Sequence, residues 1–188
     1  MIVPAIALAL VTGGADPDAR AADPKPGPAP EPLANALTLE PLAVVFAKTI
    51  ALEYERRLSS GVSLALGPVV TLGETTTGGD EPVEGTYVAW GLNLAVRFYP
   101  WSVAPAGAFV GPFAGVAWTS AEAGDSLAEG VGWSVGGLAG YTWILGRYFV
   151  FSVGAGAAWS DMDLDVDGER RGKQGVYPSL RLAIGGVF

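Results

Sequence analysis

The sequence predicts an all-β protein in which eight antiparallel strands form an up-and-down β-barrel. Three observations support this fold: the composition, the alternation of large and small residues, and the spacing of aromatic residues. Half of the 188 residues are hydrophobic, only 16% are charged, and 27 are glycine. This combination is poor in helix formers and rich in the small residues that strands accept where backbones approach closely.

The N-terminal 35 residues are expected to precede the barrel. Residues 2–11 are almost entirely apolar and are followed by small residues, so residues 1–21 are expected to form a signal peptide. Residues 22–35 are rich in Pro and Ala, which favours an extended linker. The barrel is therefore expected to span residues 36–188. No apolar run reaches the ~20 residues that a membrane-spanning helix needs.

The remainder of the chain alternates with a period of two residues, which is typical of strands. In residues 86–99 the phase that contains Trp90 and Leu92 is large and apolar, whereas the phase that contains Gly91 and Asn93 is small or polar. No clear turn signal separates the first two expected strands. The eight predicted strands are residues 36–45, 49–58, 61–73, 84–99, 107–120, 129–144, 147–161 and 174–188.

The small phase distinguishes a soluble barrel from a membrane barrel. A soluble lipocalin-like barrel turns its polar phase to water, whereas a membrane barrel turns its bulky apolar phase to lipid and fills its lumen with small and polar groups. In residues 129–160 the small phase is mostly Gly, Ala and Ser, with far less charge than a water-facing surface carries. The sequence therefore predicts a transmembrane β-barrel.

The aromatic residues recur at a spacing that fits a bilayer. Trp133 and Trp143 are ten residues apart, as are Phe149 and Trp159; ten tilted strand residues rise about 25 Å along a barrel axis. This is the height of the lipid-facing band between two aromatic girdles. The predicted upper girdle is Trp90, Trp118, Trp133 and Trp159, and the predicted lower one is Phe98, Trp101, Trp143, Phe149 and Phe188. Residues 73–84, 120–129 and the stretch after 160 are expected to form long, acidic outer loops.

The composition excludes several kinds of chemistry. The chain has no Cys and no His, which removes thiolate catalysis, the Ser-His-Asp triad and the usual zinc ligands. A net charge of -8 offers little to a nucleic-acid backbone. We expect no cofactor and no enzymatic activity. A carboxylate-only site at the rim, built from Glu84, Asp161 and Asp163, stays open as a less favoured alternative.

The aspartate-rich stretch SDMDLDVDGERR, residues 160–171, resembles the start of a calcium-binding loop. Asp163, Asp165 and Asp167 have the spacing of an EF-hand loop, but position twelve is Gln174 and no helix pattern flanks the stretch. The bidentate closing ligand is missing, so these aspartates are a weak metal candidate. The alternation is better interpreted as a strand that continues past the membrane edge.

Five charged residues fall on the small, inward phase of the predicted strands. They are Glu53, Glu55, Arg57, Arg97 and Arg181. A carboxylate–guanidinium network across the lumen would satisfy every member. We interpret this network as a plug that holds a closed barrel, and the alternative is a gate or proton path through the lumen.

Five segments resemble small outer-membrane β-barrel proteins of the OmpA-like transmembrane type. They are IALEYERRLSSGVSLALGP (50–68), NLAVRFYP (93–100), FVGPFAGVAW (109–118), GYTWILGRYFVFSVGAGAAW (140–159) and PSLRLAIGGVF (178–188). The last segment is similar to the C-terminal signal of such barrels, with Leu180, Leu182, Ile184 and Phe188 in one phase and a departure at Gly186.

The resemblance implies a place in the outer membrane of the Gram-negative cell envelope. It implies partners of three kinds: outer-membrane lipid, lipopolysaccharide and the outer-membrane insertion machinery. We expect a monomer with a filled lumen and a structural or interaction role. The alternatives are a narrow, porin-like pore and a barrel that binds a small molecule or lipid, including a soluble lipocalin-like one.

Overall fold

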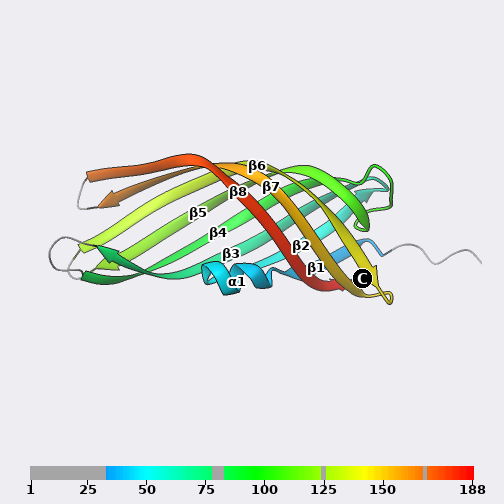
Figure 1. The fold of residues 1–188 in the computed structure, drawn as a ribbon, viewed down its shortest axis with the longest axis horizontal. Coiled ribbons are helices and arrows are strands. Elements are labelled where there is room, and N and C mark those ends of the chain that lie inside the picture. The colour runs from blue at the N-terminus through cyan, green and yellow to red at the C-terminus, as the bar shows by residue number, and fades with distance from the viewer. Residues whose placement is uncertain (1–32, 78–82, 124–125, 167–168) are drawn as a thin grey trace, which may run out of the picture. The chain divides into compact units, whose positions relative to one another are not determined.

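The computed structural model describes residues 33–77, 83–123, 126–166 and 169–188. The chain divides into two units, residues 1–31 and 32–188. The second unit is a closed barrel of eight strands in sequence order, each antiparallel to its neighbours (Figure 1). The predicted eight-stranded, antiparallel, up-and-down β-barrel is therefore confirmed. The expected signal peptide and most of the expected linker, residues 1–32, lie outside the described residues.

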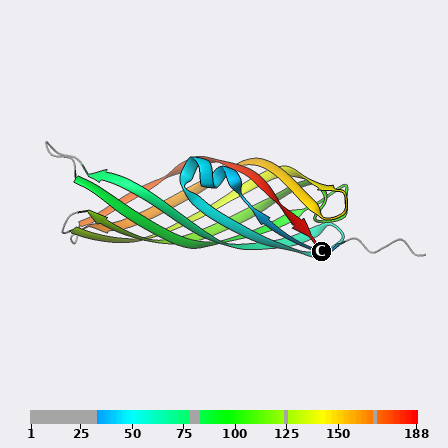
Figure 2. The same ribbon diagram turned by 90° about the horizontal axis from the view of Figure 1, so that it is seen from below.

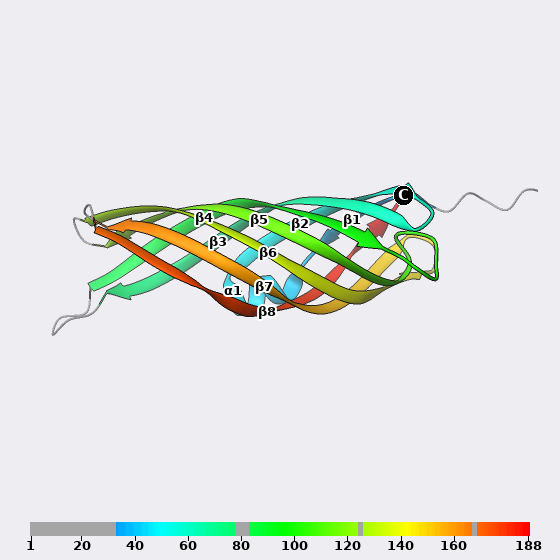
Figure 3. The ribbon, with the colours of Figure 1, turned by 90° about the horizontal axis from the view of Figure 1, so that it is seen from above.

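The described part of the chain contains eight strands and one short helix. The strands are β1 (Asn35–Leu39), β2 (Thr49–Ser59), β3 (Val62–Thr77), β4 (Val83–Phe98), β5 (Gly107–Ala123), β6 (Ser126–Leu145), β7 (Phe149–Val166) and β8 (Glu169–Val187), and the helix is α1 (Pro41–Ala47). Within these residues, no helix is both long enough and apolar enough to cross a bilayer. The turns β2–β3, β4–β5 and β6–β7 lie at the same end of the barrel as the C-terminal Phe188, and we call this the proximal end (Figures 1 and 3).

The first predicted strand is partly wrong, because it ends early and gives way to a helix. β1 stops at Leu39, and α1 replaces the rest of the segment predicted at 36–45. Pro41 lacks the N–H that a ladder needs, and its fixed φ suits the first helical position. Lys48 ends α1 with a left-handed φ of 48°. The helix lies against the wall at the middle of the barrel (Figure 2).

The long outer loops predicted from the sequence are also largely wrong. β3 and β4 continue to Thr77 and from Val83, and β5 and β6 continue to Ala123 and from Ser126. β7 likewise extends through the aspartate stretch to Val166, as the interpretation of that stretch as strand requires. Paired Thr, Ala and Glu residues can extend a hairpin ladder well beyond the apolar part of a strand, so polarity alone did not mark the strand ends.

The alternation of the sequence gives the barrel two unlike faces. Inward positions such as Ala65, Ser63 and Ala183 are buried, whereas outward positions such as Leu66, Trp90 and Val135 are exposed. Aromatic rings in the lumen lie over glycines on the neighbouring strand. A Cβ added at Gly136 would strike Phe113, and one at Gly140 would strike Phe109. The glycines thus provide the room in which these rings fill a narrow lumen.

Two strands share a Gly–Pro step at which the ladder is interrupted. In β3 the pairing with β2 breaks around Gly67 and Pro68, and in β5 the pairing with β4 breaks around Gly111 and Pro112. A Cβ at Gly67 or Gly111 would overlap a carbonyl oxygen of the neighbouring strand. Proline has no N–H to donate to a ladder. Each proline lies where the ladder with the neighbouring strand is already interrupted, so no hydrogen bond is lost there.

Candidate functional site

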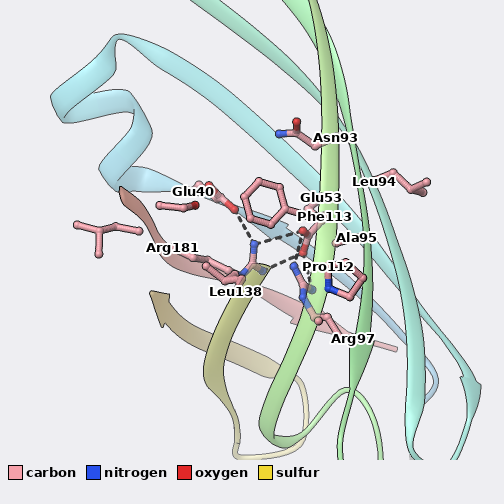
Figure 4. Close-up of a pocket in the computed structure, with 13 residues that line it drawn as sticks. Glu40, Glu53, Asn93, Leu94, Ala95, Arg97, Pro112, Phe113, Leu138 and Arg181 are labelled. Atoms are coloured by element: carbon pink, nitrogen blue, oxygen red, sulfur yellow. Dashed lines mark hydrogen bonds and ion pairs between the residues drawn. The ribbon is translucent and has the colours of Figure 1, made fainter. Parts of the chain in front are cut away.

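The strongest polar feature of the structure is a cluster of charged side chains inside the barrel. Strand alternation directs Glu53 and Glu55 of β2 inward, together with Arg97 of β4 and Arg181 of β8. β2 and β4 both flank β3, whereas β8 lies next to β1 only because the barrel closes, so Arg181 meets the carboxylates of β2 only in the closed barrel. Figure 4 shows the two guanidinium groups converging on Glu53 from different strands.

Arg97 binds both carboxylates of β2. Its Nη1 and Nη2 donate to the two oxygens of Glu53 at 2.9 and 2.6 Å, the bidentate geometry that suits a planar guanidinium. Its Nη1 also pairs with Glu55. The Arg97 guanidinium lies over the Phe109 ring, 5.2 Å from its centre, which is the geometry of a cation–π contact. The side chain is only 5% exposed.

Arg181 extends the cluster to the start of α1. Its Nη2 donates to Glu53 at 2.8 Å, and its Nη1 donates to Glu40 at 2.5 Å. Glu40 is the residue before α1, and its backbone N–H bonds to Ala51. Glu53 is thus shared by two arginines, while Glu40 ties β8 to the segment that leads into the helix.

Two hydroxyl groups complete the coordination of Glu55. Tyr99 donates to Glu55 at 2.7 Å, and Ser63 donates to the same carboxylate oxygen. Tyr99 also packs against Phe109 with ring centroids 5.8 Å apart. Since each oxygen of this buried carboxylate has a donor, its burial does not leave an unsatisfied charge.

The structure brings together charged residues that the sequence predicted for the lumen. Glu53, Glu55, Arg97 and Arg181 meet, and Arg57 lies half-buried on the same inward face of β2. Sequence reasoning missed three contributors, Glu40, Ser63 and Tyr99. All three lie on the inward phase of their segments, so the alternation carried the signal. Ser63 and Tyr99 carry no charge, and Glu40 lies in the first predicted strand, whose inward phase was not assigned.

The cluster is a closed set of ion pairs, with no unpaired carboxylate among its described members. Towards the proximal end, Ala36, Val150 and Val187 form a buried apolar cluster against which Leu33 and Ile144 pack. Beyond the charge cluster, inward residues such as Gly115 and Ser134 are only half-buried. The lumen is therefore filled near the C-terminus and less tightly filled towards the other end.

A small cavity lies beside the charge cluster. Its volume is about 110 Å³, and it is lined by Glu40, Glu53, Asn93, Leu94, Ala95, Arg97, Gly111, Pro112, Phe113, Leu138, Ser179, Leu180 and Arg181 (Figure 4). The Nε of Arg181 is buried and has no hydrogen-bond partner in the described structure. A volume of this size can hold several water molecules at ~10–15 Å³ each. The cavity thus combines charged groups, apolar walls and a hydrogen-bond donor without a partner.

The predicted girdle residues form clusters on the outer face. Trp90 stacks on Trp118 at 4.4 Å between centroids, and Trp133 lies 4.6 Å from Trp159. In the other predicted girdle, Trp143 contacts Tyr141 and Phe151 at 4.5 and 5.6 Å. The other members of this girdle are also exposed: Phe98, Trp101, Phe149 and Phe188. Trp101 lies in the β4–β5 turn.

The remaining predicted residues lie mostly along β7 and β8. Leu180, Leu182, Ile184 and Phe188 lie on the outward phase of β8 and its end, opposite the buried Arg181, Ala183 and Val187. Asp161 and Asp163 continue the outward phase of β7 beyond Trp159. The side chains of Glu84, Asp165 and Asp167 lie outside the described part of the structure. Within the residues that are described, no three acidic side chains form a group that could hold a metal ion.

Comparison with known proteins adds no family assignment. No protein family matches the chain, and no curated protein matches it.

Proposed function

We propose that the protein is a small integral outer-membrane β-barrel with a closed lumen and a structural or interaction role in the cell envelope. The observation that carries this proposal is the outward face, on which large apolar side chains are exposed around the barrel. Leu37, Leu66, Trp90, Val110, Val135, Tyr141 and Leu180 are examples from six different strands of the wall. A monomer in water rarely exposes so continuous an apolar surface.

The inner face supports the same proposal from the opposite side. A soluble barrel would place most of its large apolar residues in the lumen, whereas this lumen holds ion pairs, Gly, Ala and Ser beside a few apolar side chains such as Phe109 and Val150. The paired aromatic clusters on the outer face fit the girdles at the two borders of a bilayer. Asp161 and Asp163, beyond Trp159, would then lie in the aqueous region.

The buried cluster supports a closed barrel in preference to a pore. Arg97 and Arg181 are each held by two carboxylates, and the apolar cluster of Ala36, Val150 and Val187 lies between them and the proximal end. An eight-stranded barrel has an interior just wide enough for side chains. The proposal therefore assigns the cluster a structural role and no catalytic one.

Heat-modifiable migration tests the membrane proposal. The protein, refolded into detergent micelles or liposomes, should run on an SDS gel at a different position before and after boiling, because a folded membrane barrel resists SDS. A barrel that stays monomeric and soluble without detergent would contradict the proposal. It would favour the soluble, ligand-binding alternative.

Conductance measurements separate the closed barrel from the narrow pore. Planar bilayers that contain the refolded protein should show no discrete channel steps. The conductance of the unaltered protein is compared with that of Arg97→Ala and Arg181→Ala, because each variant removes a guanidinium from the centre of the cluster. Regular single-channel steps from the unaltered protein would assign it a pore function.

A further inference from the structure

The wall of the barrel is incomplete beside β8. β1 pairs with β8 at only four positions, from Ala36 with Val187 to Leu39 with Ile184. From Glu169 to Ala183, β8 pairs with β7 on one edge and with no described strand on the other. On the far side of this interruption, β2 begins at Thr49, opposite Thr71 of β3. The closure of the barrel is therefore confined to its proximal part.

The sequence is suited to this interruption. Pro178 stands within β8 and keeps its position in the ladder with β7, opposite Ala157. A proline is accepted within a strand when its nitrogen faces an unpaired edge, and β8 has such an edge here. Pro41 prevents β1 from continuing as a strand and is the first residue of α1. One proline thus lies on the β8 side of the opening, and the other lies where β1 gives way to α1.

Helix α1 lies over this opening, beside β2 and β8, and is fastened at both ends. Before its first turn, Glu40 pairs with Arg181 of β8 at 2.5 Å; after its last turn, Lys48 pairs with Glu74 of β3 at 3.0 Å. No residue of α1 is buried, and Val45 and Phe46 are 73% and 82% exposed. A seven-residue helix has little stability of its own, so these contacts hold it in place.

The cavity lies next to this opening. Ser179 and Leu180 line it from β8, Glu40 lines it from the start of α1, and Phe113 and Leu138 form apolar walls. Leu180 is 75% exposed on the outer face. Arg181 is buried, and its Nε lacks an acceptor among the described residues. The same place therefore offers a cationic donor inside the barrel and an apolar surface outside it.

We propose that the opening beside α1 admits a single-chain amphiphile with a carboxylate head group, and that Arg181 binds this head group. This inference rests on the proposed membrane location. The ligand carboxylate takes the place of the Glu40 carboxylate when α1 moves aside, so one carboxylate replaces another on the same guanidinium. The alkyl chain lies along Leu180 and the apolar side chains of α1.

The width of the opening restricts the ligand to one chain. Neighbouring strands lie ~4.8 Å apart, so beside residues 49–51 of β2, where only β1 is missing, about 10 Å separates β8 from β2, which is the width of an α-helix with side chains. A single alkyl chain can share this space with a displaced α1, whereas a lipid with several chains cannot. A carboxylate fits because Arg181 already holds carboxylates at two of its nitrogens.

Photolabelling tests the site. The probe is a long-chain fatty acid with a diazirine close to its carboxyl end, added to the folded barrel in zwitterionic liposomes; adducts are then mapped by mass spectrometry. We expect adducts on lumen-facing residues of β5 and β6, at or near Phe113 and Leu138. The matched probe is the alcohol with the same chain and diazirine. It should label the lumen at least fivefold less, because it has no charge for Arg181.

Glu40→Gln provides the protein variant, with Glu129→Gln as its control. Glu40→Gln weakens the contact that the ligand must displace, so lumen labelling by the acid should rise severalfold. Glu129 is exposed on β6, far along the chain from the cluster, so its substitution should leave labelling unchanged. If Glu40→Gln does not fold, the comparison of acid and alcohol on the unaltered protein still decides the matter.

Two results would overturn the inference. One is labelling confined to outward residues with both probes; the other is equal lumen labelling by acid and alcohol. Heat-modifiable migration of the same samples is measured in parallel. A barrel that is heat-modifiable but shows no acid-specific labelling would refute the binding site and leave the proposed membrane location standing.

Discussion

At the scale of single residues, the stability of the barrel depends on the arginine shared by two buried carboxylates. Arg97→Ala would leave Glu55 buried without its cation and remove both hydrogen bonds to Glu53. Removal of one partner from a buried ion pair typically costs about 3–5 kcal/mol. We expect the urea midpoint of the folded barrel to fall, as measured by the loss of heat-modifiable migration or of tryptophan emission. The control, Arg56→Ala, removes an exposed arginine of β2 and should shift the midpoint little; an unchanged midpoint for Arg97→Ala would reject the network.

The phenol of Tyr99 offers a second test at this scale. Tyr99→Phe keeps the ring that packs on Phe109 but removes the hydrogen bond to the buried Glu55. A buried acceptor that loses its donor costs roughly 1–3 kcal/mol. Tyr54→Phe is the matched control, because the Tyr54 hydroxyl donates to Asn35 in an exposed position. Equal urea midpoints for the two variants would mean that Ser63 and Arg97 satisfy Glu55 without the phenol.

At the scale of elements, the Gly–Pro steps of β3 and β5 depend on the absence of a side chain. In Gly67→Ala the added methyl group would overlap the backbone oxygen of Leu52, so β2 and β3 must separate. Overpacking of this kind costs about 1–3 kcal/mol, and we expect a lower folding yield in liposomes and a lower urea midpoint. Gly137→Ala is the control, because no atom lies within 4 Å of the added Cβ. A variant at Gly67 that folds as well as the one at Gly137 would show that the step tolerates a side chain.

The elements also show what a sequence can and cannot predict here. The eight strands and their inward faces follow from the period-two alternation, because burial of one face per strand leaves that pattern directly in the residues. The alternation also placed Arg97 and Arg181 in one lumen. It could not predict α1, since LAVVFA reads equally well as strand or helix and the outcome depends on Pro41 and on the gap beside β8. Glu40 was missed because the inward phase of the first predicted strand was not assigned, and its pairing with Arg181 arises only from closure of the barrel.

At the scale of the whole barrel, the packed lumen near the C-terminus contrasts with the wall beyond Leu39. The charge cluster and the apolar proximal cluster rigidify the lumen near the C-terminus, where β1 closes the sheet against β8. Beyond Leu39 a short helix lies over the wall, and an ion pair and a backbone hydrogen bond tie it at each end. The two features occupy different parts of β8. The segment that pairs with β1 closes the barrel, and the segment without a strand neighbour begins where that ladder ends.

The proposed membrane location makes a prediction about the tryptophans, since they lie on the outer face and in its turns. Single-tryptophan variants that keep Trp118 or Trp143 should be quenched by phospholipids with brominated chains, most strongly when the bromines lie close to the head groups. The reason is that each belongs to a predicted girdle at one border of the apolar band, about 25 Å apart. Bromines near the chain ends should quench both less.

A Phe113→Trp variant in a background without other tryptophans is the control, because its ring would lie in the lumen beside Gly136 and away from lipid. Stronger quenching of Trp118 by bromines at the chain ends would place that residue at the bilayer centre and exclude the girdle arrangement, whereas absence of quenching at both outer positions would mean that the apolar face does not contact lipid.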